Sequence, residues 1–168
     1  MPISSRLANQ SDLAVISSIV FACSTRLKNN GSPDWAHYYT IEKLDEKLKN
    51  QTAYIFSLET VPVGVVFLSE NDLSYYTDID LNKFSMPTAP SLYISTLSVS
   101  PEFQHQGIAS QIVEFCEQTA RSKSIKFLRL DCNGDDLPLV NFYKKRGFVF
   151  ISSMAEESNY FLFEKTII

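Results

Sequence analysis

The stretch LSVSPEFQHQGIAS, residues 97–110, decides how this chain is interpreted, because it joins two different apolar patterns across one glycine. Residues 91–100 are rich in β-branched side chains and are followed by Pro101, which predicts a strand that ends there. From 108 onward apolar side chains recur at every fourth position, which predicts a helix. Gly107 is one of only five glycines in the chain, and glycine is used where a backbone turns tightly or approaches a bulky group.

Two interpretations of Gly107 are open from these residues alone. The first amides of a helix have no acceptor within the helix and lie at its positive end, so a strand-to-helix turn of small residues can bind a phosphate. Ala109 is small, and Ser110 can add a hydroxyl donor. The alternative is a glycine that only relieves a tight turn. The patterns G-x-x-x-x-G-K-[ST] and G-x-G-x-x-G do not occur, so neither an NTPase nor a Rossmann dinucleotide fold is indicated.

Composition narrows the class of protein. With 168 residues, 45% hydrophobic and 20% charged, the chain is predicted to be one globular domain over residues 1–168. The net charge of −4 argues against a nucleic-acid partner. The three cysteines show neither a metal-binding nor a disulfide spacing, so we expect reduced, buried thiols and no metal. We see no signal peptide and no membrane span, and therefore expect a soluble, cytoplasmic protein without a membrane partner.

The other segments alternate between strand and helix patterns. Strands are predicted at 3–7, 53–59, 63–70, 91–100, 126–132, 148–154 and 159–165, and helices at 11–28, from 40 onward, from 108 onward and at 137–146. A tight turn is expected around Pro62, and residues 71–90 form a long polar connection. This order predicts an α/β fold, with a mixed central sheet of about seven strands and helices on both faces.

Two motifs in this order resemble the GCN5-related N-acetyltransferase (GNAT) family. LSVSPEFQHQGIAS resembles its acetyl-coenzyme A signature, [QR]-x-x-G-x-[GA], at Gln104, Gly107 and Ala109. LRLDCNGDDLPLVNFYKKRGF, residues 128–148, resembles its second signature, which ends in Phe-Tyr-x-x-x-Gly-Phe. The resemblance covers nearly the whole chain, implies the acyl-CoA N-acyltransferase fold and favours the phosphate-binding interpretation of Gly107.

The resemblance also implies roles for individual residues. Acetyl-CoA would be the acyl donor, and its pantetheine arm would pair with the backbone of Leu97, Ser98 and Val99, where the central strand bows away from its neighbour. Tyr143 would protonate the departing thiolate, which a phenol with a pKa near 10 can do. The pyrophosphate would be bound by the backbone amides of Gln104, His105, Gln106, Gly107, Ile108, Ala109 and Ser110.

Two positions depart from the family pattern. Asp136 stands where members commonly carry an asparagine that touches the cofactor. An ionised aspartate caps a helix equally well but donates no hydrogen bond, which leaves a cofactor contact of Asp136 open. His105 replaces the usual glycine, and we expect its ring to face solvent while its backbone amide remains usable.

A general base is needed because an amine substrate arrives protonated. Glu70, at the end of the third strand, is the predicted base, and a solvated strand-end charge is the alternative. Asp78 and Asp80 in the long connection are candidates for the entrance of an acceptor, or ordinary loop residues. Asp131 lies on a buried strand, where a hydrogen-bonded structural carboxylate is the simpler interpretation.

Aromatic residues before the second helix are candidates for the acceptor pocket. Trp35, Tyr38 and Tyr39 cluster there, and packing of this loop onto the domain is the alternative. Residues 159–168 are apolar enough to allow a homodimer through the C-terminal strands.

These residues predict an N-acetyltransferase that passes the acetyl group of acetyl-CoA directly to a primary amine in a ternary complex. The acceptor could be a small amine, an amino acid, an aminoglycoside-like compound or a protein N-terminus. A non-catalytic acyl-CoA sensor or regulatory module of the same fold is the alternative, and a plain interaction domain that binds no coenzyme A is a third.

Overall fold

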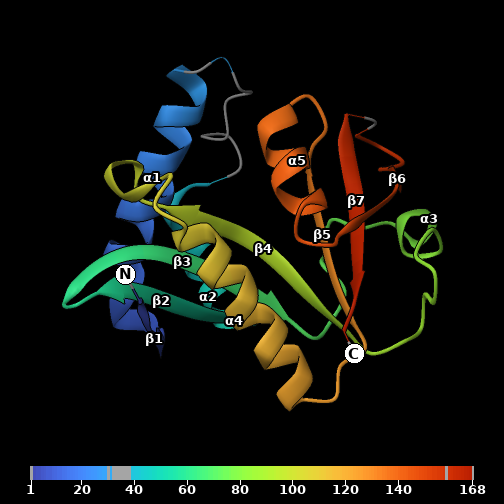
Figure 1. The fold of residues 1–168 in the computed structure, drawn as a ribbon, viewed down its shortest axis with the longest axis horizontal. Helices are drawn as coiled ribbons and strands as arrows, with labels where there is room; N and C mark the ends of the chain where they lie inside the picture. The colour runs from blue at the N-terminus through green and yellow to red at the C-terminus, as the bar shows by residue number, and fades with distance from the viewer. Residues whose placement is uncertain (1, 30, 32–38, 158, 168) are drawn as a thin grey trace. The chain divides into compact units, whose positions relative to one another are not determined.

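The structure, a computed structural model, describes residues 2–29, 31, 39–157 and 159–167 (Figure 1). The chain divides into two compact units. Met1–Leu68 and Thr96–Phe115 form the first unit, and Ser69–Ser95 and Cys116–Ile168 form the second. The strand β4 (Ser91–Val99) and the helix α4 (Ile108–Ser122) each contribute residues to both units.

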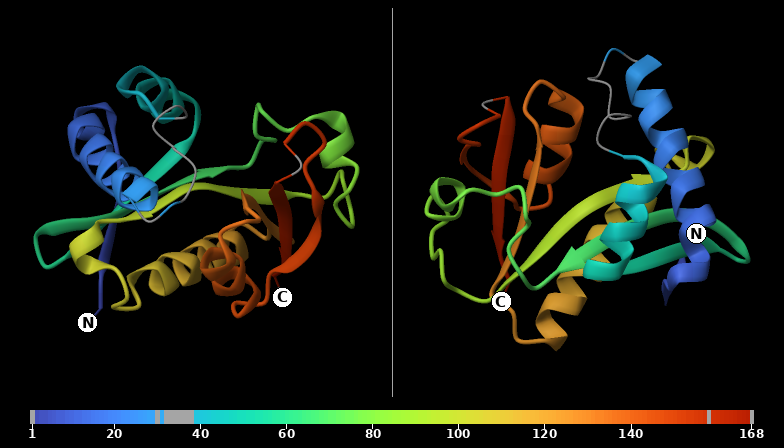
Figure 2. Two further views of the ribbon diagram at one scale, coloured as in Figure 1. Left: turned by 90° about the horizontal axis from the view of Figure 1, so that it is seen from above. Right: turned by 180° about the vertical axis from the view of Figure 1, so that it is seen from behind.

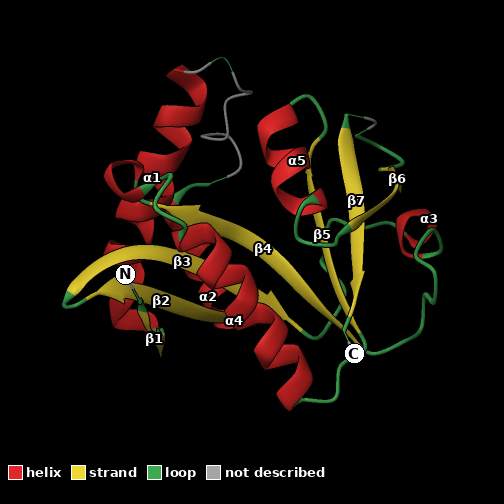
Figure 3. Ribbon diagram, viewed as in Figure 1, coloured by secondary structure: helices red, strands yellow, loops and turns green. Residues whose placement is uncertain are grey.

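Seven strands form a mixed sheet in the order β1-β2-β3-β4-β5-β7-β6 (Figure 3). β4 and β5 pair in parallel, and α4 connects them, as parallel strands require a crossover. Antiparallel pairing joins β1 with β2, β2 with β3, β5 with β7, and β6 with β7. This arrangement confirms the predicted fold class. The other strands are β1 (Ser4–Leu7), β2 (Thr52–Leu58), β3 (Val61–Ser69), β5 (Phe127–Asn133), β6 (Val149–Ser153) and β7 (Tyr160–Thr166), and the other helices are α1 (Leu13–Asn29), α2 (Ile41–Asn50), α3 (Asp78–Leu81) and α5 (Leu137–Lys144).

In the first unit, helices cover both faces of the strands (Figure 2). The alternation along β2 explains why: Ala53 and Ile55 belong to the core under α1 and α2, whereas Tyr54 and Phe56 place their rings edge-on against Phe115 of α4. The core under α1 and α2 consists of Ile16, Ile19, Val20, Leu44, Leu48, Ala53, Ile55, Val65 and Phe67.

The sequence predicts most ends of the strands and helices to within two residues of their observed positions. The predicted turn around Pro62 is wrong. The turn between β2 and β3 is made by Glu59 and Thr60, and Glu59 takes the left-handed φ of 52°. Pro62 instead lies inside β3, opposite Ser57, where the β2–β3 register shifts. A proline is tolerated there because a bulge does not need its missing N–H.

The long connection between β3 and β4 packs as part of the second unit. It contains α3, which Thr77 and Asp80 cap reciprocally. Asp80 is only 1% exposed and also accepts the backbone N–H of Ala155 at 2.7 Å, so it is a structural carboxylate. The connection contributes to the second core, which consists of Leu73, Tyr76, Phe84, Tyr93, Met154 and Leu162.

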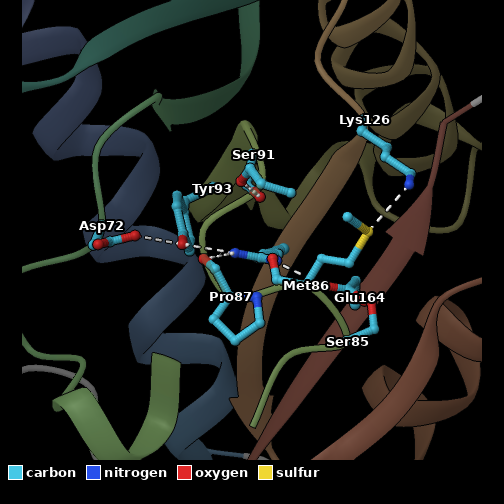
Figure 4. A network of polar contacts seen from close by, with 10 residues as sticks. Asp72, Ser85, Met86, Pro87, Ser91, Tyr93, Lys126 and Glu164 are labelled. Carbon is cyan, nitrogen blue, oxygen red and sulfur yellow. Dashed lines mark hydrogen bonds and ion pairs between the residues drawn. The ribbon is translucent and has the colours of Figure 1, made fainter. Parts of the chain in front are cut away.

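A fully buried arginine, Arg129, ties this connection to the sheet. Figure 4 labels its partners Met86, Pro87, Tyr93 and Glu164. Arg129 of β5 pairs with Glu164 of β7 at 2.9 Å, and these two residues are register partners in the sheet. Its guanidinium also donates to the backbone carbonyls of Met86 and Pro87 at 2.6 and 3.3 Å. It donates further to the hydroxyl of Tyr93 at 3.2 Å. One cation therefore holds three segments that are distant in sequence.

The cysteines and the helices also bear on predictions made from the sequence. All three cysteines are free and buried, and burial raises the pKa of the Cys132 thiol to about 12. Among the described residues, no helix combines the length and apolar character needed to cross a bilayer.

The buried ion pair gives the first prediction. Arg129→Met should lower the free energy of unfolding by about 3–5 kcal/mol, because Glu164 would remain buried without its cation. Lys123→Met is the matched control: it breaks the pair with Glu70, whose side chain is 56% exposed, and should cost at most about 1 kcal/mol. Urea unfolding measures both. Equal losses for the two variants would contradict the role given to Arg129.

Candidate functional site

The exit of β4 from its pairing with β5 is the first feature of the site. The β4–β5 ladder runs from Ser91 opposite Phe127 to Tyr93 opposite Arg129. Three residues further on, Thr96 has a φ of 52° and is 7% exposed. A β-branched residue is rarely left-handed, and such strain gathers at functional positions. The hydroxyl of Thr96 donates to the hydroxyl of Tyr39 at 3.2 Å, which places this strained residue against the N-terminal part of the first unit.

The loop after β4 is held from within. The backbone N–H of Ser100 donates to the carbonyl of Val63 at 2.9 Å, and that of Gln104 donates to the carbonyl of Pro101 at 3.3 Å. The side-chain amide of Gln104 donates to the carbonyl of Val99 at 2.9 Å. The glutamine of the signature therefore folds the loop back onto the strand from which it comes.

Two left-handed residues then start α4. His105 has a φ of 63° and Gly107 a φ of 80°. Glycine adopts a left-handed φ without a steric penalty, which is a physical reason for the glycine that the family pattern leads one to expect at this position. The N–H of Gln111 donates to the carbonyl of Gly107 at 3.2 Å, so the amides of Gly107, Ile108 and Ala109 precede the first bond of this helix. A Cβ built on Gly107 would have no atom within 4 Å, so this side of the turn is open.

An arginine from α1 joins this turn, which sequence reasoning missed. Arg26 donates from Nη1 to the carbonyl of Pro101 at 2.9 Å, and its Nη2 lies 3.3 Å from Nε2 of His105. His105 is exposed, as expected. No pattern in the sequence signals the contact between Arg26 and His105, because 79 positions separate them.

The second signature builds both ends of α5, in the second unit. Asp136 is the N-cap, and its carboxylate accepts the N–H of Leu139 at 3.0 Å. At the other end Gly147 has a φ of 80°, and the N–H of Phe148 reaches the carbonyl of Tyr143 at 3.2 Å. The N–H of Gly147 donates to the carbonyl of Lys144 at 3.0 Å, which completes a Schellman C-cap.

The Schellman cap explains the Phe-Tyr-x-x-x-Gly-Phe spacing. Tyr143 and Phe148 are the apolar pair of this cap, and their ring centroids are 5.5 Å apart, edge to face. Tyr143 is 6% exposed and also packs against Phe142 and Phe163, at 5.1 and 6.4 Å. The motif therefore fixes the ring of Tyr143 through backbone geometry.

The turn that precedes α5 contains a buried polar side chain. Asn133, the last residue of β5, is 1% exposed, and its side-chain oxygen accepts the N–H of Asp135 at 2.8 Å. Its Nδ2 has no hydrogen-bond partner among the described residues. Such a donor costs free energy until an acceptor meets it.

The residues predicted as the base and as the acceptor pocket differ in where the structure places them. Trp35 and Tyr38 lie outside the described residues. Tyr39 is half-buried and packs against the core under α1 and α2. Glu70 is exposed, and its carboxylate pairs with Lys123 at 2.5 Å. This placement matches the alternative given for Glu70, a solvated strand-end charge.

With this geometry, comparison with known proteins identifies the class. A sequence model described as the Acetyltransferase (GNAT) family matches residues 21–148. The chain belongs to the GNAT family of acetyltransferases, whose acyl donor is acetyl-CoA.

Individual relatives agree with this family. The uncharacterized N-acetyltransferase YesJ of Bacillus subtilis is 26% identical over 163 residues, which cover 93% of this chain and 86% of the relative. A GNAT-family acetyltransferase of Listeria monocytogenes matches with a TM-score of 0.78 at 20% identity, over 98% of this chain and 94% of that one. The PaiA N-acetyltransferase of Thermoplasma acidophilum, solved in complex with coenzyme A, matches with a TM-score of 0.74 at 18% identity, over 99% of both chains.

The residues of the first unit fit an anionic donor. The turn at Gly107 has open space on its Cβ side, two left-handed residues and the leading amides of a helix of 15 residues. No cluster of three or more potential metal ligands occurs in the described part of the chain.

The C-cap of α5 gives a second prediction. Gly147→Ala should lower the free energy of unfolding by about 1–2 kcal/mol, because an L side chain resists the left-handed conformation. A Cβ at this position would contact Lys165 at an ordinary 3.5 Å. The loss of stability therefore measures the cost of the left-handed backbone and not a steric clash. Lys145→Ala, in the same turn and exposed, should change stability by less than about 0.5 kcal/mol. Matching unfolding curves for both variants would contradict the cap.

Proposed function

We propose that this protein transfers the acetyl group of acetyl-CoA directly to a primary amine, within a ternary complex. The observation that carries the proposal is the open turn at Gly107, at the start of α4, in a chain of the GNAT family. The donor's pyrophosphate would lie against the backbone amides of residues 104–110. Since the N–H of Gln104 already donates to Pro101, we assign the strongest contacts to Gly107, Ile108 and Ala109.

The rest of the donor would follow β4. Beyond the last pair with β5, the backbone of Leu97, Ser98 and Val99 would pair with the pantetheine arm as an added strand does. A backbone amide of this segment would stabilise the negative charge on the thioester oxygen in the transition state. The strain at Thr96 supports this proposal, because it redirects the backbone immediately before these residues.

Tyr143 would act as the general acid. The amine nitrogen forms a bond to the acetyl carbon, the carbon–sulfur bond breaks, and the phenol gives its proton to the departing thiolate. The amine's proton goes to a base through water. Glu70 was predicted for that step, and its exposed pair with Lys123 does not support it. Asp136 would act as the cap of α5, and its contact with the donor stays open.

A homodimer through the C-terminal strands stays a prediction. β7 has β5 on one side and β6 on the other. Edge-to-edge pairing at this end of the sheet would therefore use β6, where Val149 and Phe150 are 63% and 42% exposed.

Gly107 provides a direct test of donor binding. Gly107→Glu should weaken acetyl-CoA binding at least about a hundredfold, because a carboxylate would face the pyrophosphate across an open turn. Gly107→Ala is the matched control: it carries the same left-handed strain, about 1–2 kcal/mol, without the charge. Calorimetric titration with acetyl-CoA measures the affinity, and thermal unfolding measures the strain.

The two variants separate the interpretations of Gly107. A phosphate site predicts similar stability losses and a much larger affinity loss for the glutamate. Equal affinity losses would show that the residue serves only the turn. A wild-type protein that gives neither heat nor thermal protection with acetyl-CoA would overturn the proposed function.

Tyr143 provides a test of the chemistry. Tyr143→Phe should lower kcat by about 10²–10⁴-fold while leaving acetyl-CoA affinity within about threefold, because it removes only the proton donor. Tyr54→Phe, on β2 and half-buried against Phe115, is the control and should keep full activity. Release of free thiol, across a panel of amines, measures turnover.

The same assay distinguishes the proposed transferase from the alternative, a sensor or regulatory module. A wild-type protein that binds acetyl-CoA and turns over none of the amines would be a sensor or regulatory module. Full activity of Tyr143→Phe would exclude the phenol as the acid.

A further inference from the structure

We infer that Asp131, held by the hydroxyls of Tyr75 and Tyr76 and flanked by the exposed ring of Tyr75, binds a positively charged group of the acceptor, distinct from the amine that is acetylated. This inference rests on the proposed transferase function and names the acceptor class for it: a molecule with a second cationic centre. All three residues belong to the second unit.

The geometry joins two segments that are far apart in sequence. The hydroxyls of Tyr75 and Tyr76 donate to the same oxygen of Asp131, Oδ1, at 2.9 and 2.8 Å. The two rings meet edge to face, with centroids 5.2 Å apart. Tyr76 is only 8% exposed and serves to hold the carboxylate, whereas the ring of Tyr75 is open to solvent. A carboxylate beside an exposed aromatic ring offers both an ion pair and a π face, which are two means by which proteins bind organic ammonium groups.

Tyr76 stays a hydrogen-bond donor in this arrangement. Burial, and then the negative charge of Asp131, raise the pKa of Tyr76 well above its ordinary value. Tyr76 therefore remains a protonated donor at neutral pH, and Asp131 remains the acceptor.

Exposure distinguishes this carboxylate from a structural one. Asp80 is 1% exposed, and its donors from Thr77, Lys83 and Ala155 enclose it. Asp131 is half-buried, and Tyr75 beside it is 49% exposed. A ring held at the surface by its own hydroxyl leaves an aromatic wall that solvent, and therefore a ligand, can reach.

The strand position of Asp131 supports the same conclusion. It lies on β5 two residues after Arg129, where the ladder with β4 ends. Residues 131 and 133 lie on one face of β5 because strand side chains alternate. Asn133, with its unpartnered buried Nδ2, therefore shares that face, and because this group is a donor it would meet an acceptor atom of the ligand and not its cation.

The ring of Tyr76 packs against a buried tyrosine that is itself held by hydrogen bonds. Tyr76 packs edge-on against Tyr93, with centroids 5.8 Å apart. The hydroxyl of Tyr93 donates to Asp72 at 2.5 Å and accepts from Arg129 at 3.2 Å (Figure 4). The buried cation thus fixes the ring on which Tyr76 rests, which preorganises the proposed site.

The chemistry selects the acceptor class. A carboxylate stabilises the charged form of an amine that it binds, whereas the attacking amine must be neutral. The group held at Asp131 is therefore a second cation, and the attacking amine lies elsewhere on the same molecule. Diamines and cationic amines with a spacer fit this requirement, and simple monoamines lack the second charge.

Cadaverine and pentylamine, which share one carbon chain, test this inference. Calorimetric titration of the coenzyme A-loaded protein should show at least about tenfold tighter binding of cadaverine, and Asp131→Asn should remove that preference. Tyr75→Ala should reduce cadaverine binding by about threefold through loss of the aromatic wall. Asp135→Asn removes an exposed carboxylate four positions away and should leave the preference unchanged.

The outcomes separate this inference from the proposed function. Equal binding of both amines, binding of neither, or an Asp131→Asn variant that behaves like Asp135→Asn would overturn the inference, even if acetyl-CoA binds and pentylamine is acetylated. Failure of acetyl-CoA to bind would overturn the proposed function instead. Thermal unfolding of each variant confirms that it folds, and Tyr75→Ala provides a surface change should Asp131→Asn fail to fold.

Discussion

The left-handed backbone at Thr96 is the constraint on which the proposed chemistry depends. A strand that stayed regular would continue its ladder with β5 and would keep its backbone groups within the sheet. At Thr96 the chain instead adopts a conformation that costs a β-branched residue about 1–3 kcal/mol. The fold retains it because the residue is buried and its hydroxyl meets Tyr39. The residues that follow, Leu97–Val99, are those proposed to receive the donor.

Both family signatures fix the backbone conformation at the end of a helix. The first builds the start of α4, where His105 and Gly107 are left-handed and the Cβ side of Gly107 is open. The second builds the end of α5, where Gly147 closes a Schellman cap around Tyr143 and Phe148. In each case the glycine supplies a left-handed φ, and the proposed chemistry belongs to neighbouring groups: amides in one motif and a phenol in the other.

A buried ion pair, Arg129 with Glu164, joins the segments of the second unit. The sheet supplies two charged partners, Arg129 and Glu164, in register on adjacent strands, and the connection before β4 supplies carbonyls and a hydroxyl that complete the cation's hydrogen bonds. A buried pair of this kind contributes little net stability compared with apolar residues, but breaking it is costly, so it specifies one arrangement. That arrangement determines where Tyr76 rests, and Tyr76 in turn meets Asp131.

The sequence by itself determined what depends on neighbours a few residues apart. The cap at Asp136 and the period of each strand and helix set the order of elements, because hydrogen bonding at helix ends and side-chain alternation are local. The spacing of the two signatures likewise identified the family. The tertiary structure alone decided which distant side chains meet: Arg26 with His105, and Asp131 with Tyr75 and Tyr76. Such pairs have no signature in the chain, because their separation in space depends on how whole strands and helices pack. The same reason explains why Glu70, judged from a strand end, proved to lie in an exposed pair with Lys123.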